Sequence, residues 1–98
     1  MNNEGVRFAW DEAKAELNLK KHRVSFEEAA TVFADENARL KHDPDHSEKE
    51  DRFILIGFSS KLKLLVVCHA YRDNDNLIRI ISARKATRNE SKQYGRFK

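Results

Sequence analysis

The sequence predicts an α+β domain, with two N-terminal helices packed on an antiparallel β-sheet of three to four strands and a C-terminal helix after the sheet. Two observations support this class. Helix-capping patterns occur near both ends of the 98 residues, and β-rich apolar runs lie between them. Helices and antiparallel strands that are segregated along the chain are typical of α+β folds. A chain of this length can bury one modest core, so we expect a single domain over residues 1–98.

The first helix is predicted over residues 12–21. Asp11 precedes it, and its carboxylate can accept hydrogen bonds from the free backbone N–H groups of the first turn. Trp10, Ala13 and Leu17 are spaced so that they give this helix one apolar face, which we expect to face the sheet.

A second, shorter helix is predicted over residues 26–34. Ser25 is its N-cap, and Glu28 three residues later completes a capping-box pattern. Because only two or three residues separate the helices, we expect a helical corner that covers one face of the sheet.

The strands are predicted from apolar runs bounded by polar segments. Residues 62–72 and 77–87 flank Asp-Asn-Asp-Asn at 73–76, which favours a turn, so together they predict a β-hairpin. Residues 52–58 form a further strand, and 38–42 are a candidate short strand at the sheet edge. The side chains expected to hold the sheet to the N-terminal helices are those of Leu64, Val66, Cys68, Ile78 and Ile80.

The C-terminal helix is predicted over residues 88–97. Thr87 and Glu90 form a second capping-box pattern at its start. Its apolar stripe is thin, with Tyr94 and Phe97 as anchors, so this helix is expected on the sheet edge or against a partner rather than in the core.

Charge and cysteine content limit the functional classes. The net charge is +3 and 36% of the residues are charged, which permits a polyanionic partner without requiring one. The single cysteine, Cys68, forms no internal disulfide and is expected to be a small core residue. No apolar signal region or membrane-length run occurs, so we expect a cytoplasmic protein without membrane contact.

Metal and nucleotide sites are not expected. His42, Asp43, Asp45 and His46 are possible metal ligands, but the Asp-Pro-Asp sequence between the histidines is typical of a flexible loop. Cys68 is too isolated to complete a tetrahedral zinc site. No phosphate-binding glycine loop and no Ser-His-Asp signature is present. We therefore expect no cofactor.

Arg79 is the cationic residue with the most informative position. It lies between isoleucines in a predicted strand, where an arginine is costly unless it meets a carboxylate, a phosphate or water. One alternative is a salt bridge to Glu50 or Asp51, and the other is phosphate recognition by its planar fork of donors. His69, Tyr71 and Arg79 share a sheet face if the strand register allows it.

The remaining His, Arg, Lys and Glu side chains suit metal-independent cleavage of RNA. In that reaction the 2′-hydroxyl of the RNA is the nucleophile. It requires a base for the 2′-proton, an acid for the leaving 5′-oxygen and cations on the phosphorane. DNA lacks the 2′-hydroxyl and resists this reaction.

The chain resembles the BrnT family of toxins from bacterial type II toxin–antitoxin modules. The resemblance extends over residues 6–94. The segments that carry it, in order, are Phe-Ala-Trp-Asp-Glu at 8–12, Asn-Leu-Lys-Lys-His at 18–22, Val-Ser-Phe-Glu-Glu-Ala at 24–29, Val-Phe-Ala-Asp at 32–35, Glu-Asp-Arg at 50–52, Ile-Gly at 56–57 and Ile-Arg-Ile-Ile-Ser-Ala-Arg at 78–84. One departure is Arg23, where the family often has glycine.

The resemblance implies a RelE-like toxin domain with metal-independent endoribonuclease activity that inhibits growth and translation. It also implies an RNA substrate and neutralisation by a BrnA-type antitoxin, in a heterotetramer that contacts operator DNA through the antitoxin. The alternative is a non-catalytic module of the same fold that binds an antitoxin or nucleic acid.

Candidate site residues follow from the matched motifs and from the hairpin. We expect Arg79 and Arg84 to contact phosphate and Arg52 to stabilise the transition state, while His22, His69 or Glu50 transfers protons. The candidate catalytic residues are His22, Glu50, Arg52, His69, Arg79 and Arg84. The candidate RNA-binding residues are Lys20, Lys21, Tyr71 and Arg72. The sequence does not assign base and acid among them.

Overall fold

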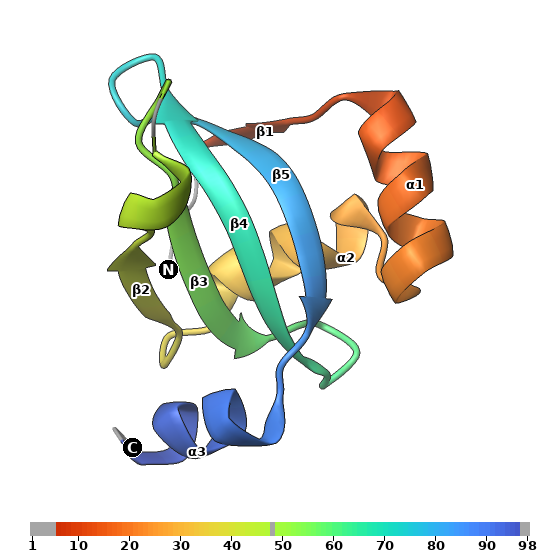
Figure 1. The fold of residues 1–98 in the computed structure, drawn as a ribbon, viewed down its shortest axis with the longest axis vertical. Helices are drawn as coiled ribbons and strands as arrows, with labels where there is room; N and C mark the ends of the chain where they lie inside the picture. Colours follow the sequence, from red (N-terminus) through yellow and green to blue (C-terminus); the bar gives the residue numbers. More distant parts are fainter. Residues whose placement is uncertain (1–5, 48, 97–98) are drawn as a thin grey trace.

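The computed structural model describes residues 6–47 and 49–96, which form a twisted sheet with helices around it (Figure 1). The helices are α1 (Glu12–His22), α2 (Phe26–Thr31) and α3 (Arg88–Arg96), and two short 3₁₀ turns are η1 (Val32–Ala34) and η2 (Pro44–His46). The strands are β1 (Arg7–Ala9), β2 (Arg39–His42), β3 (Phe53–Phe58), β4 (Leu64–Arg72) and β5 (Leu77–Lys85). The predicted α+β class is confirmed. Phe97, a predicted anchor of the last helix, lies outside the described residues.

The sheet has five strands in the order β1-β5-β4-β3-β2, and β1 runs parallel to β5. The prediction of a purely antiparallel sheet of three to four strands was therefore wrong. The strand that was missed, β1, spans only three residues, too short to show a clear period-two pattern. The candidate edge strand at 38–42 is present as β2, which pairs antiparallel with β3.

One face of the sheet packs against α2 and η1, which lie behind it in Figure 1. The core between these layers includes Phe26, Val32, Leu65, Val67 and Ile80. Ile80 was predicted to belong to this core.

The predicted core residues of β4 face away from α2 instead of toward it. Val66, with Leu64 packed beside it, belongs to a smaller cluster that includes Tyr94 of α3, and Cys68 is only partly buried. The alternation in 62–72 is real, but both faces are apolar, so the sequence pattern alone does not indicate which face meets the helices.

α1 uses a different face from the predicted one. Leu17 is 66% exposed, whereas Asn18 is buried. The Asn18 side-chain amide donates to the backbone oxygens of Val24 (3.0 Å) and Ala83 (2.9 Å) and accepts from the Ala83 N–H (3.1 Å). Thus a buried amide, rather than an apolar stripe, joins α1 to β5.

We expect Asn18→Ala to lower the free energy of unfolding by about 2–4 kcal/mol, because it leaves buried backbone groups of Val24 and Ala83 without partners. Urea denaturation measures this change. Leu17→Ala on the same helix is the matched control and should change stability by less than about 0.5 kcal/mol. Equal midpoints for the two variants would contradict the role given to Asn18.

The predicted caps are largely confirmed. The Asp11 carboxylate accepts from the N–H groups of Ala13 and Lys14, and the Ser25 hydroxyl accepts from the Glu28 N–H at 3.0 Å. The capping box of Ser25 and Glu28 was only half correct, because the buried Glu28 carboxylate accepts a hydrogen bond from Ser59 instead of turning back to Ser25.

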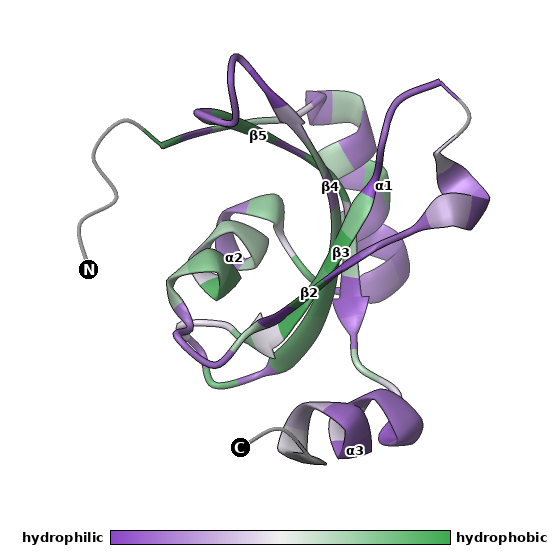
Figure 2. Ribbon diagram, turned by 90° about the vertical axis from the view of Figure 1, so that its left-hand side faces the viewer, coloured by the Kyte–Doolittle hydropathy of each residue, from purple (hydrophilic) through white to green (hydrophobic). Residues whose placement is uncertain are grey.

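α3 lies across the end of the sheet (Figure 2), where its Tyr94 packs with Ile56 and Val66 of the face opposite α2. Thr87 and Glu90 form the predicted reciprocal capping box at its start. Tyr94 is buried against Phe58 and donates its hydroxyl proton to Asp35 at 2.7 Å. Burial and the neighbouring carboxylate raise the pKa of Tyr94 to about 12. The thin stripe of α3 is therefore enough to hold it on the sheet.

Candidate functional site

A β-bulge in β5 brings the arginines of this strand to one face of the sheet. Cys68 pairs with Ser82, but the next residue of β4, His69, pairs with Ile80, so Ile81 is an extra residue. Arg79 and Arg84 are five positions apart and would point to opposite faces of a regular strand. The extra residue shifts the alternation by one, so both lie on the face that α2 does not cover.

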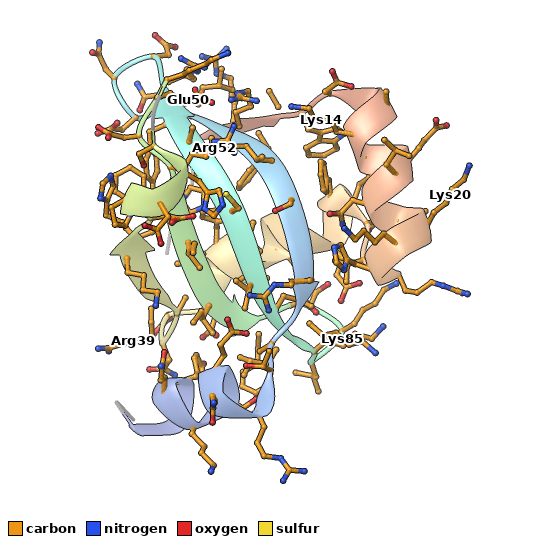
Figure 3. All side chains as sticks on the ribbon, in the orientation of Figure 1. Lys14, Lys20, Arg39, Glu50, Arg52 and Lys85 are labelled. Atoms are coloured by element: carbon orange, nitrogen blue, oxygen red, sulfur yellow. The ribbon has the colours of Figure 1, made fainter. Side chains whose placement is uncertain are left out.

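On this face, a groove of about 250 Å³ lies between the 43–52 loop and β5. Its lining residues are Asp43, His46, Arg52, Ile54, Val66, Cys68, Ile81, Ser82 and Arg84. An adjoining hollow of about 300 Å³ is lined by Asp45, His46, Lys49, Glu50 and Arg52. His46 and Arg52 line both spaces, so they lie at the junction. Figure 3 labels Glu50 and Arg52 on this face.

The loop that carries these residues is closed by one hydroxyl group. The Ser47 hydroxyl donates to the Asp43 carbonyl oxygen at 2.6 Å and accepts from the Arg52 N–H at 3.0 Å. The Asp43 N–H donates to the Arg52 carbonyl oxygen at 2.9 Å. These bonds hold the two ends of the loop side by side, and thereby hold His46 near Arg52.

His46 is oriented by a neighbouring carboxylate. Its Nδ1 lies 2.9 Å from Asp43 Oδ2, and the Asp43 side chain is only 13% exposed while that of His46 is 67% exposed. A shielded carboxylate behind an accessible imidazole is a geometry suited to proton transfer. Sequence reasoning considered both residues only as metal ligands. The signal that it missed was the three-residue spacing of Asp43 and His46 around Pro44.

The arginines of this face differ in their partners. In the described part of the chain, the Arg52 guanidinium has no ion-pair partner, whereas Arg79 and Arg72 both pair with Glu50. The salt bridge considered for Arg79 is thus present. The Nε atom of Arg79 is buried and has no hydrogen-bond partner among the described residues. Arg84 makes two bonds to the Glu90 carboxylate, at 2.8 and 2.9 Å.

Arg84 lowers the pKa of Glu90 from its usual 4.5 to about 2. A carboxyl whose pKa is lower in the folded state stabilises the fold above the unfolded pKa and loses this contribution as the pH falls. We expect Glu90→Gln to be less stable than wild type at pH 7 by up to about 1 kcal/mol, given the exposure of the pair. The difference should shrink between pH 4.5 and 2 in thermal denaturation. A difference that does not change with pH would contradict this prediction.

Several predicted site residues are brought together on the groove face. They are Glu50, Arg52, Arg72, Arg79 and Arg84. The expectation that His69 shares a face with Arg79 was wrong. His69 is fully buried on the α2 side, its ring lies 4.8 Å from that of Phe33, and burial lowers its pKa. Tyr71 belongs to the same aromatic cluster, and its hydroxyl is 3.1 Å from His69 Nε2.

The three predicted site residues of α1 lie apart from the groove. Lys20, Lys21 and His22 are in the last turn of α1, beyond β5 (Figure 1), and Lys20 points away from the sheet in Figure 3. Their separation follows from Asn18, which sets the face of α1 that meets β5. His22, a candidate catalytic residue, therefore does not lie with Glu50 and Arg52.

Cys68 also differs from its predicted role as a core residue, because it lines the groove. Burial raises the pKa of its thiol, and the charge of Arg52 opposes this increase. Within the described residues there is no group of three or more His, Cys, Asp or Glu side chains that could hold a metal ion.

The fold and the groove define a class: a small basic α+β protein with a histidine and several arginines on one face of its sheet. The family model "Ribonuclease toxin, BrnT, of type II toxin-antitoxin system" matches residues 10–90, so the chain belongs to this family. The resemblance found in the sequence is confirmed. Membership implies an RNA substrate and an antitoxin partner.

The fold is similar to that of the Brucella abortus ribonuclease toxin BrnT, known from a 1.1 Å crystal structure. The TM-score is 0.64 with 24% sequence identity, over 85% of this chain and 99% of that one. No curated protein matches the chain. Across the described residues, none of the helices has the length and apolar character needed to span a membrane.

Proposed function

We propose that the groove cleaves RNA without a metal ion, by attack of the RNA 2′-hydroxyl on the adjacent phosphorus. The convergence of His46, Glu50 and Arg52 on the hollow beside the groove supports this proposal most strongly. Glu50 supplies a carboxylate as the base, His46 an imidazole as the acid and Arg52 a guanidinium as the cation that the reaction requires.

The reaction proceeds with a defined transfer of protons and bonds. Glu50 accepts the 2′-proton while the 2′-oxygen bonds to phosphorus, and Arg52 stabilises the charge of the phosphorane. His46, oriented by Asp43, donates a proton to the 5′-oxygen as its bond to phosphorus breaks. The products are a 2′,3′-cyclic phosphate and a free 5′-hydroxyl group.

The remaining arginines bind phosphates on either side of the reacting one. Arg84 contacts one phosphate at the end of the groove near α3, and Arg79 and Arg72 contact another beside Glu50. Lys20 and Lys21 stay predicted contacts of the RNA backbone outside the groove, and His22 lies with them. We do not assign a chemical step to His69, because it is 0% exposed.

In the cell, this activity inhibits growth and translation, and a BrnA-type antitoxin neutralises it. The two proteins assemble as a heterotetramer in which the antitoxin contacts operator DNA. We expect the toxin to act in the cytoplasm, where its RNA substrate is located.

Incubating the antitoxin-free protein with RNA in EDTA tests this proposal. We expect fragmentation of RNA and no cleavage of DNA of the same sequence. Intact RNA with a folded sample would support the alternative, a non-catalytic module that binds an antitoxin or nucleic acid.

A further inference from the structure

β2 leaves one edge of the sheet open. It pairs with β3 on one side, and no described strand pairs with its other side. Figure 2 looks onto this edge and shows β2 with no described element in front of it. All four residues of β2 are exposed. An open edge offers unpaired backbone donors and acceptors to another chain.

The backbone groups that point outward can be assigned. The Asp43 N–H donates to the Arg52 carbonyl oxygen, which makes this pair a hydrogen-bonded one. Hydrogen-bonded and non-hydrogen-bonded pairs alternate along an antiparallel ladder, so Lys41 and Ile54 form the next hydrogen-bonded pair. The N–H and C=O groups of Leu40 and His42 therefore point away from β3, toward the free edge.

A cleft of about 520 Å³ lies directly beside this edge. Leu40, Phe53 and Tyr71 supply its apolar lining, and Leu40 is 51% exposed. Asp51 and Asp75 stand at its rim together with Glu50. Leu40 pairs with Leu55 of the main core, so its side chain lies on the α2 side of the sheet, opposite the groove.

The charge of this cleft contrasts with that of the whole protein. The net charge is +3, yet Asp51 and Asp75 place negative charge at the rim of the cleft. Arg72 and Arg79 balance the charge of Glu50. Carboxylates repel the phosphates of RNA and attract lysine and arginine side chains. A basic, partly apolar protein segment thus fits the cleft better than the RNA substrate does.

We propose that an extended segment of the antitoxin adds to β2 as a sixth strand of the sheet. Its backbone bonds to the outward groups of Leu40 and His42, an apolar side chain enters the cleft, and Lys or Arg side chains meet Asp51 and Asp75. The inference rests on the proposed function, in which an antitoxin neutralises the toxin. β2 leads directly into the 43–52 loop, so a chain anchored there is close enough to cover the groove.

Calorimetric titration with a BrnA-type antitoxin that neutralises this protein tests the proposal. We expect Leu40→Asp to weaken antitoxin binding at least tenfold, because it introduces a charge into the cleft. Leu62→Asp is the matched control, since Leu62 is 81% exposed in a turn away from β2. The control should bind like wild type. Antitoxin binding by Leu40→Asp as tight as by wild type would overturn the proposal.

Hydrogen exchange on the wild-type protein gives a second readout that needs no variant. The Leu40 and His42 amides should exchange fast in the free protein and slowly in the complex, whereas the Lys41 amide should be protected in both. Unchanged exchange at Leu40 and His42 in a saturated complex would also overturn the proposal.

RNA cleavage by the free variants separates this inference from the proposed function. Leu40→Asp should cleave RNA at the wild-type rate, and a loss of cleavage would assign the edge to RNA binding instead. If wild type itself fails to cleave RNA, the proposed activity is wrong, while the titration and the exchange data still decide whether the antitoxin binds at β2.

Discussion

Arg52→Ala should lower kcat for RNA cleavage about 10²–10³-fold. Arg52 lines both parts of the site, and no described carboxylate pairs with its guanidinium, so its charge is available to the phosphorane. Removing one donor that stabilises transition-state charge has an effect of this size in other enzymes. Single-turnover kinetics on a short RNA measures the change.

Two comparisons define the effect of Arg52. Arg52→Lys keeps the charge but not the planar fork of donors, so we expect partial recovery of cleavage. Arg7→Ala removes an equal charge from the opposite edge of the sheet, where Arg7 pairs with Asp73, and should leave kcat unchanged. An equal loss in both alanine variants would indicate a general effect of net charge rather than catalysis at Arg52.

His46→Ala should lower kcat about 10²–10⁴-fold, the usual contribution of a positioned acid or base. The protonated imidazole of His46 is the proposed proton donor to the leaving 5′-oxygen. An RNA with a 5′-thio leaving group does not require this proton, so its cleavage should be much less sensitive to the substitution. Rates for both substrates in wild type and variant measure the difference.

The same loop provides controls for this histidine. His42→Ala removes an exposed imidazole that pairs with Asp51 and does not line the groove, so it should cleave normally. Asp43→Asn should cleave RNA at a rate between those of wild type and His46→Ala, because the amide still contacts His46 but lacks the carboxylate charge. Equal cleavage of the oxygen-linked RNA by His46→Ala and wild type would exclude His46 as the acid.

Local signals predicted the elements of the fold well. Asp11, Ser25 and Thr87 are N-caps as predicted, because a capping bond spans only two or three residues. The hairpin turn at 73–76 was also predicted from a local signal, because Asp and Asn side chains bond to nearby backbone groups. Pairings that join distant parts of the chain were not predictable, and β1 depends on such a pairing with β5.

The faces of the elements were harder to predict than their positions. Asn18 faces the sheet and Leu17 faces solvent, because three hydrogen bonds favour this orientation of α1 over burial of one leucine. In β5, period-two counting separates Arg79 from Arg84, and only the extra residue Ile81 reunites them. A bulge depends on strand register, which a single sequence does not specify.

The candidate site was predicted in part for the same reason. Arg52 and Glu50 are two residues apart at the entry to a strand, so their proximity was visible in the sequence. His69 was misassigned because its strand context does not indicate which face is buried. Asp43 and His46 were missed as a pair because their geometry depends on the Ser47 hydroxyl closing the loop.

The ends of the RNA fragments test the central claim most directly. The antitoxin-free protein is incubated in EDTA with a short RNA, and the products are identified by mass spectrometry. We predict 2′,3′-cyclic phosphate and 5′-hydroxyl ends, and no cleavage at a nucleotide whose 2′-hydroxyl is replaced by hydrogen. Fragments with 5′-phosphate ends, or cleavage at the 2′-deoxy position, would contradict attack by the 2′-hydroxyl in this groove.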